Sequence, residues 1–288
     1  MTEILQNLLN LLNLEKIEEN LYRGGSQDLG GKSVFGGQVL GQSLVAASRT
    51  VTGRRAHSLH GYFLRPGDME APIVYKVERI RDGRSFTTRR IVAIQHGEPI
   101  FTMEASFQVP EEGFSHQVGM PDVPKPDGLP SITDLRRKMA EEHPEKYRNR
   151  PIRELPIEMR PVQPANPYLN EKQPPFQKVW FRTVGLLPDD VILHQCVLAY
   201  ASDFGLLRTA SLPHDISFRQ KNVNVASIDH AMWFHGDFRA DQWLLYAMES
   251  PSASGSRGFS TGKIFTQDGR LVASVAQEGL MRVRPVSG

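Results

Sequence analysis

Residues 227–238 of this 288-residue chain read SIDHAMWFHGDF, and residues 57–68 read HSLHGYFLRPGD. Both stretches place a histidine shortly before a pair of aromatic residues, Tyr-Phe in the first and Trp-Phe in the second. The segments that flank them also follow a common order, at an offset of about 170 residues. This spacing indicates an internal repeat, so we expect the chain to contain two similar halves.

Each half combines one small-residue apolar run with several alternating segments. The apolar runs are VFGGQVLGQSLVAASRTV at 34–51 and DVILHQCVLAYAS at 190–202, and both predict a helix. Residues 72–109 and 227–283 alternate apolar and polar positions between Asp-Gly and His-Gly turns, which predicts antiparallel strands. The predicted fold class is therefore α+β, with a long helix against a strongly curved antiparallel sheet, made twice. Since one half alone would expose a sheet edge, we expect the halves to join edge to edge.

Prolines mark the boundary between the halves. They concentrate between Pro110 and Pro175, where they disfavour both helix and central strand. The predicted organisation is an N-terminal repeat over 1–115, a proline-rich linker over 116–175 with one short helix near ITDLRRKMAEEH, and a C-terminal repeat over 176–288. The leucine spacing of the first 20 residues predicts an additional amphipathic helix docked on the protein or on another subunit.

Composition excludes several classes of function. The formal net charge is +2, so nothing indicates a nucleic-acid-binding surface. No apolar run reaches the roughly 20 residues that span a bilayer, and the N-terminus lacks the basic flank of a signal peptide. Cys196 is the only cysteine, which rules out an internal disulfide. A cytoplasmic location is therefore expected.

Three polar residues stand in apolar surroundings. Asp203 closes the second apolar helix, Ser227 opens an apolar strand, and Gln277 interrupts a Val/Ala strand. Burying an acid, a hydroxyl and an amide is unfavourable unless they form hydrogen bonds. If the three segments converge, these groups could bind and activate a water molecule, which makes hydrolysis the leading reaction class. Taken singly, each residue is more often a turn former or a surface group.

Other reactive side chains have simpler interpretations. Asp229-His230 resembles a catalytic dyad, but His60 recurs in the first half without a preceding acid, which favours a structural role in both repeats. Strand alternation predicts that Asp229 lies on the same face as Ser227. Cys196 lies mid-helix among apolar residues and is expected to be inert. The dispersed histidines form no common zinc spacing, so no metal is expected.

The longest motifs together resemble the acyl-CoA thioesterase II family. They are VFGGQVLGQSL, HSLHGYFLRPGD, YASDFGLL, SIDHAMWFH and TQDGRLVASVAQEGLMR. The resemblance runs from the N-terminal helix to about Met281. The resemblance implies a double hotdog fold, in which two helix-in-sheet units share one chain. It also implies an acyl-CoA substrate, no separate cofactor because coenzyme A belongs to the substrate, and assembly into homodimers or larger homo-oligomers.

The resemblance also implies roles for single residues. The family's acid, hydroxyl and amide match Asp203, Ser227 and Gln277, although the hydroxyl residue is more commonly threonine. The first half offers only Gln42 and Ser43 near the position that matches the acid, which implies one catalytic half. Oxyanion donors are expected at a glycine-rich helix start, in either half. Arg84 and Arg257, beside small-residue turns, are candidate contacts to the phosphates of coenzyme A.

Two other functions remain open from the sequence. A hotdog hydratase or dehydratase would pair an acid with a nearby histidine on the helix, whereas here no histidine follows Asp203 until His214. A non-catalytic acyl-CoA binding protein would gain nothing obvious from a buried acid, hydroxyl and amide.

Overall fold

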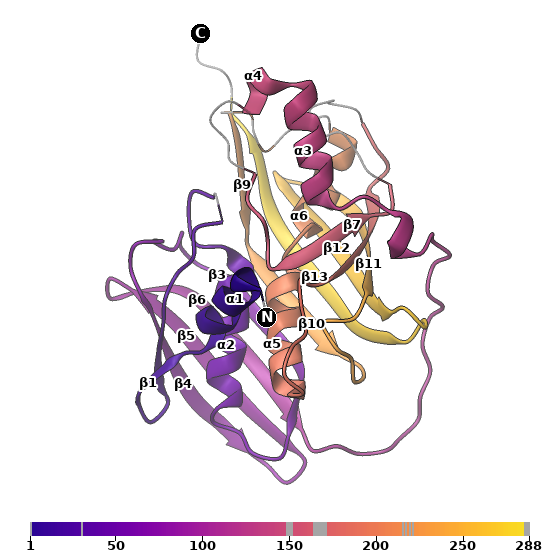
Figure 1. Cartoon of the computed structure of the whole chain (residues 1–288). Helices are drawn as coiled ribbons and strands as arrows, with labels where there is room; N and C mark the ends of the chain where they lie inside the picture. The colour runs from indigo at the N-terminus through magenta and orange to yellow at the C-terminus, as the bar shows by residue number, and fades with distance from the viewer. Residues whose placement is uncertain are drawn as a thin grey trace.

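The computed structural model describes residues 2–29, 31–147, 152–163, 172–214 and 222–284, together with 216, 218 and 220. Two central helices form its core, α2 (Gly36–Ser48) and α5 (Val191–Ser202). A Cβ added at Gly37 would lie 2.2 Å from the carbonyl oxygen of Tyr200, and one at Gly41 would lie 3.1 Å from that of Cys196. The helices therefore pack antiparallel and in close contact (Figure 1). Both are apolar or small on nearly every side, as expected of helices buried all round.

The strands in the described residues form one 13-stranded antiparallel sheet around these helices. Its order is β1-β2-β4-β5-β6-β3-β10-β13-β12-β11-β8-β7, and β9 pairs with β13 outside this path. The first half contributes β1 (Glu15–Glu18), β2 (Leu21–Gly24), β3 (Arg55–Phe63), β4 (Ile73–Asp82), β5 (Phe86–Gln95) and β6 (Glu98–Gln108). The remaining strands are β7 (Ile157–Pro161), β8 (Phe176–Thr183), β9 (Val223–Ser227), β10 (Asp229–Phe234), β11 (Leu244–Ser254), β12 (Arg257–Thr266) and β13 (Leu271–Val283).

The two halves join through β3 and β10, which pair antiparallel with Leu59 opposite Met232. Both side chains are fully buried. The predicted α+β class and edge-to-edge joining of two hotdog units are therefore confirmed. Figure 1 shows the first-half strands on one side of the central helices and the second-half strands on the other.

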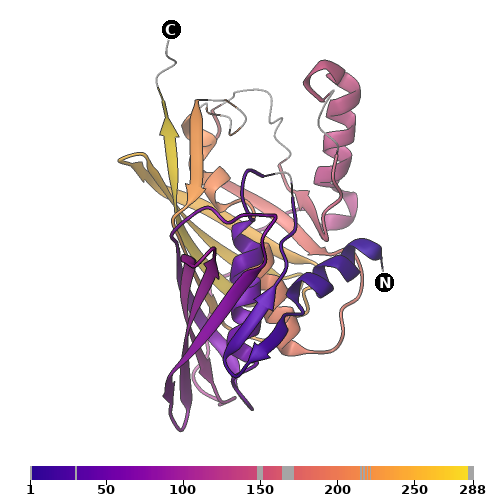
Figure 2. The ribbon, with the colours of Figure 1, turned by 90° about the vertical axis from the view of Figure 1, so that its left-hand side faces the viewer.

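Smaller helices complete the fold. The expected N-terminal helix is α1 (Glu3–Leu12), which buries Leu5, Leu8 and Leu12. The helix expected in the proline-rich stretch is α3 (Ile132–Glu142), none of whose side chains is buried. Figure 2 shows α1 and α3 on the same side of the sheet. The others are η1 (Pro126–Gly128), α4 (Pro144–Tyr147), α6 (Leu206–Ser211) and η2 (Leu212–His214). Residues 164–171 of the expected linker lie outside the described residues. No helix in the described part of the chain is both long and apolar enough to cross a membrane.

The register of β3 against β10 corrects one inference from the repeat. His60 is exposed on the outer face, with its ring centroid 5.1 Å from that of Trp233, whereas His230 is fully buried on the inner face. In this pairing His60 lies opposite Ala231 and His230 lies opposite Gly61. Because side chains alternate along a strand, a one-residue offset between the halves places the two histidines on opposite faces. The two histidines therefore do not occupy equivalent positions in the repeats.

Candidate active site

Asp203 lies where the end of α5 meets the start of α2. It is the C-cap residue of α5, and its Oδ2 accepts a hydrogen bond of 2.9 Å from the backbone N–H of Gly37. Phe35, the N-cap residue of α2, makes no side-chain cap hydrogen bond. Asp203 therefore caps α2 from the other half of the chain, at a helix end where the peptide dipoles favour a negative charge.

The structure brings Asp203, Ser227 and Gln277 together. Gln277 Nε2 donates to Asp203 Oδ1 at 3.0 Å and to Ser227 Oγ at 2.7 Å. Ser227 Oγ–H donates to the same carboxylate oxygen at 3.4 Å. Gln277 is only 2 % exposed, whereas Asp203 and Ser227 are partly exposed. A carboxylate, a hydroxyl and an amide therefore converge beside the start of α2.

Ser227 reaches this position because the chain bends beside it. Ser227 ends β9, and Ile228 separates it from the start of β10. Both strands pair with β13, the strand that carries Gln277. The expectation that Asp229 shares the face of Ser227 assumed one continuous strand, and the bend breaks that alternation. Asp229 instead accepts a hydrogen bond of 2.6 Å from the backbone N–H of Glu278.

His230 lies behind the three residues, and no pattern in the sequence connects it with them. Its Nδ1 is 3.0 Å from Gln277 Oε1, and its Nε2 is 2.9 Å from Ser202 Oγ. Both N–H groups of the Gln277 amide are occupied by Asp203 and Ser227, so its oxygen faces His230 and accepts from Nδ1–H. Burial lowers the pKa of His230 below its ordinary 6.5, although the charge of Asp203 opposes this shift. A neutral His230 thus fixes the orientation of the amide.

Two glycines allow the close approach of α2 to Asp203. A Cβ at Gly36 would lie 2.8 Å from Asp203 Oδ2, and one at Gly37 would meet the backbone oxygen of Tyr200 at 2.2 Å. The sequence predicts a glycine-rich helix start near the reaction centre without indicating which half supplies it. The structure places the start of α2, from the first half, against the acid from the second.

The two arginines predicted to bind phosphate lie on hairpins of different halves. Arg84 is in the turn between β4 and β5. Arg257 begins β12, and its Nε donates to Glu278 Oε1 at 2.8 Å. In the part of the chain that the structure describes, neither arginine shares a hydrogen bond with Asp203, Ser227 or Gln277. A contact from either one to coenzyme A stays a prediction.

Cys196 is fully buried in α5, and burial raises the pKa of its thiol. A neutral thiol in an apolar helix is a poor nucleophile. Across the described ranges, no group of three or more His, Cys, Asp or Glu side chains is placed to hold a metal ion.

Comparison with known proteins identifies the family. Residues 148–280 match the family model described as acyl-CoA thioesterase, and residues 25–108 match that of the acyl-CoA thioesterase N-terminal domain. The chain is 47% identical to acyl-CoA thioesterase 2 of Haemophilus influenzae, over 98% of this chain and 99% of that protein. It is 43% identical to human acyl-coenzyme A thioesterase 8, over 96% of this chain and 88% of the human protein.

Solved structures agree with these matches. An acyl-CoA thioesterase II of Mycobacterium marinum is 47% identical and superposes with a TM-score of 0.79, covering 97% of this chain and all of that one. A hot dog fold protein of Alicyclobacillus acidocaldarius, only 19% identical, superposes with a TM-score of 0.76 over 96% of this chain and 98% of its own, which supports the fold alone. By sequence over nearly its whole length and by fold, the chain belongs to the acyl-CoA thioesterase family.

Proposed function

We propose that the protein hydrolyses acyl-CoA thioesters to a free fatty acid and coenzyme A, using water activated by Asp203, Ser227 and Gln277. One observation carries this proposal: the carboxylate, the hydroxyl and the amide converge at the start of α2. Membership of the thioesterase family supports the choice of substrate.

Each group has a distinct task in this mechanism. When a water molecule enters, it replaces direct hydrogen bonds of Ser227 and Gln277 with Asp203. Ser227 and Gln277 then hold the water, and Asp203 takes one of its protons as the water oxygen attacks the thioester carbonyl. The positive end of α2 stabilises the oxyanion that forms. Collapse of the tetrahedral intermediate breaks the C–S bond, and the thiolate of coenzyme A takes up the proton that Asp203 received. One water and one thioester thus yield one fatty acid and one thiol.

Asp203→Asn tests the central step. The asparagine keeps the size of the side chain and an oxygen that can accept from Gly37, but it cannot take a proton from water. We expect turnover to fall about 100-fold or more, the usual scale for a general base, with unchanged melting temperature and coenzyme A binding. Asp229→Asn is the matched control, because Asp229 is a nearby acid that contacts only backbone in this region. Near-normal thiol release by folded Asp203→Asn would remove Asp203 from the mechanism.

Isotope labelling separates water activation from direct attack by Asp203. In a single turnover in ¹⁸O-water, activated water places ¹⁸O directly in the fatty acid. Attack by the carboxylate forms a mixed anhydride; when water adds to its aspartyl carbon, the bridging oxygen of Asp203, which is unlabelled, leaves with the first fatty acid and ¹⁸O enters the carboxylate. We favour activation of water over direct attack by Asp203, because Asp203 Oδ1 is already bound by the hydroxyl and the amide that would hold the water.

Three related expectations belong to the same proposal. No separate cofactor or metal takes part, so prolonged chelation and Cys196→Ser should leave hydrolysis within about twofold of its normal rate.

The chains associate as homodimers or larger homo-oligomers in the cytoplasm, and light scattering that shows only a single-chain mass would contradict this association. A hydratase or dehydratase would leave the thioester intact, so release of free thiol distinguishes hydrolysis from that alternative.

A further inference from the structure

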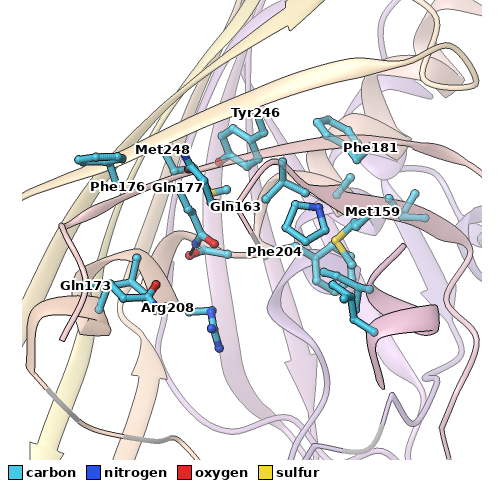
Figure 3. A pocket seen from close by; sticks show the side chains of 18 of the residues that line it. Met159, Gln163, Gln173, Phe176, Gln177, Phe181, Phe204, Arg208, Tyr246 and Met248 are labelled. Carbon is cyan, nitrogen blue, oxygen red and sulfur yellow. Dashed lines mark hydrogen bonds between the residues drawn. The ribbon is translucent and has the colours of Figure 1, made fainter. Parts of the chain in front are cut away.

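A cavity of about 670 Å³ lies in the second half of the molecule, a volume within the range of small-molecule sites. Its walls come from α3 on one side, from β7, β8 and β11 on another, and from the ends of α5 and α6. Apolar side chains that line it include Leu135, Met139, Met159, Val179, Phe181 and Met248. In Figure 3, Met159 and Phe181 lie towards one end of the cavity, and Gln173 and Arg208 towards the other.

Gln177 is one of several polar side chains that line the cavity, and its N–H groups are not available to a ligand. Gln177 Nε2 donates to the carbonyl oxygen of Gly205 at 2.9 Å and to Thr209 Oγ1 at 2.7 Å. Both of its N–H groups therefore already have partners within the protein. The central part of the cavity thus suits an unbranched apolar chain better than a ligand with its own hydrogen-bonding groups.

The cavity borders the chain segment that carries the proposed base. Ala201, Phe204 and Gly205 line it, and Asp203 lies between them in the chain. Tyr246 lines it too, and its hydroxyl donates to the carbonyl oxygen of Ser202 at 2.9 Å. Burial raises the pKa of Tyr246, and the negative charge of Asp203 adds to this shift, as expected if the carboxylate lies close to this wall.

The helices that precede the two halves differ in a way that fits a ligand. Leu5, Leu8 and Leu12 of α1 are at most 2 % exposed, so the apolar face of α1 is packed on the protein. Ile132, Leu135 and Met139 follow helical spacing on α3 and line the cavity, yet none of them is buried. The apolar face of α3 therefore forms one wall of the cavity.

We propose that this cavity receives the acyl chain of the thioester, and that α3 limits the chain length that fits. The inference rests on the proposed function, which supplies an acyl-CoA substrate with its carbonyl carbon at Asp203. The chain then runs past Phe204 into the space under α3, and Leu135 and Met159 become residues that determine specificity.

Binding of thioether analogues tests this assignment without requiring hydrolysis. S-butyl-coenzyme A and S-dodecyl-coenzyme A carry short and long chains on the same headgroup, and neither can be hydrolysed. We expect calorimetry to show the dodecyl analogue binding at least about 100-fold more tightly, because each buried methylene adds affinity. Leu135→Trp, which fills the cavity, should reduce this ratio at least about 10-fold while the affinity for the butyl analogue stays within about twofold.

Lys138→Trp is the matched control, since Lys138 lies on the same helix but is exposed and outside the cavity. It should leave both affinities unchanged. Met159→Trp fills the cavity from β7 and provides the same test if Leu135→Trp does not fold. Equal affinities of the two analogues for the unmodified protein, or a ratio that a folded cavity-filling variant leaves unchanged, would overturn the assignment. Such a result would leave the proposed role of Asp203 intact. Conversely, an active Asp203→Asn variant would rule out that role without affecting the ratio of affinities for the dodecyl and butyl analogues.

Discussion

At the scale of single residues, Gln277 holds the proposed site together. Its two N–H groups bind Asp203 and Ser227, and its oxygen faces His230. Every polar atom of the side chain is therefore engaged while it is buried, as a stable buried amide requires. Removal of any one partner should disturb the others, so the residues should behave as a unit in mutational experiments.

Ser227 and Gln277 should show this coupling directly. Ser227→Thr keeps the hydroxyl and should retain activity, whereas Ser227→Ala and Gln277→Ala should each reduce turnover by about 10-fold or more. Because both hold the same water, the double variant should be less impaired than the product of the two single effects. Steady-state turnover of all four variants provides the comparison, and strictly multiplicative losses would argue against a shared water.

His230 should act through Gln277 and not on the substrate. His230→Asn offers an amide N–H near the position of Nδ1 and should keep turnover within a few-fold. His230→Leu leaves the buried oxygen of Gln277 without a donor, which is unfavourable and frees the amide to turn. We expect it to lower kcat at least about 10-fold with little change in KM.

The comparison of the two His230 variants separates positioning from a general loss of stability. Melting temperatures recorded alongside the kinetics provide the control. Equal loss of activity in both variants, in proportion to their loss of stability, would show that His230 is only a packing residue.

At the scale of secondary-structure elements, the site depends on how closely the start of α2 approaches α5. Gly36→Ala would place a Cβ 2.8 Å from Asp203 Oδ2, and the carboxylate, at the end of a side chain, can move away. Gly37→Ala would meet the backbone oxygen of Tyr200 at 2.2 Å, and a helix backbone cannot move as readily.

The two substitutions should therefore have different effects. Gly36→Ala should lower turnover about 10-fold or more with a melting temperature within a few degrees of normal, because the added Cβ displaces the ends of two side chains, the Asp203 carboxylate and the Phe63 ring, and no backbone. Gly37→Ala should destabilise the fold by about 2 kcal/mol or more, through strain between the helices. Thermal unfolding and thiol release measured on both proteins check this, and full activity of Gly36→Ala would show that the contact with Asp203 is not needed.

At the scale of the whole molecule, the halves depend on each other at β3 and β10. These strands pair along their length, and Leu59 and Met232 bury each other across the junction. The base Asp203 comes from the second half and the helix start that binds it from the first. Neither half alone contains the proposed site.

Residues 1–115 expressed alone should therefore fail to form a stable soluble protein. The fragment would expose the edge of β3 and the face of α2 that packs on α5, and an unpaired apolar edge promotes aggregation. Solubility and thermal melting of the fragment test this expectation, with the full chain as the control. A soluble fragment with a cooperative transition would show that the first half folds independently.

The central helices, most strands and their hairpin turns follow from the sequence alone. Apolar periodicity and turn residues such as Asp82-Gly83 indicate local conformation. The internal repeat indicates that the same order of helix and strands occurs twice. The unusual polarity of Asp203, Ser227 and Gln277 in apolar segments likewise needs only the sequence to be noticed. These features depend on neighbours in the chain, which is why they can be read there.

Other features required the tertiary structure. The bend at Ile228, the inward position of His230 and the capping of α2 by Asp203 depend on strand register and on contacts between residues far apart in the chain. A shift of one residue reverses the face of a strand, and no local pattern records it. The cavity under α3 also arises from several distant segments that leave a space between them. The sequence by itself determined which elements form and which polar residues are out of place, and only packing decided which of them meet.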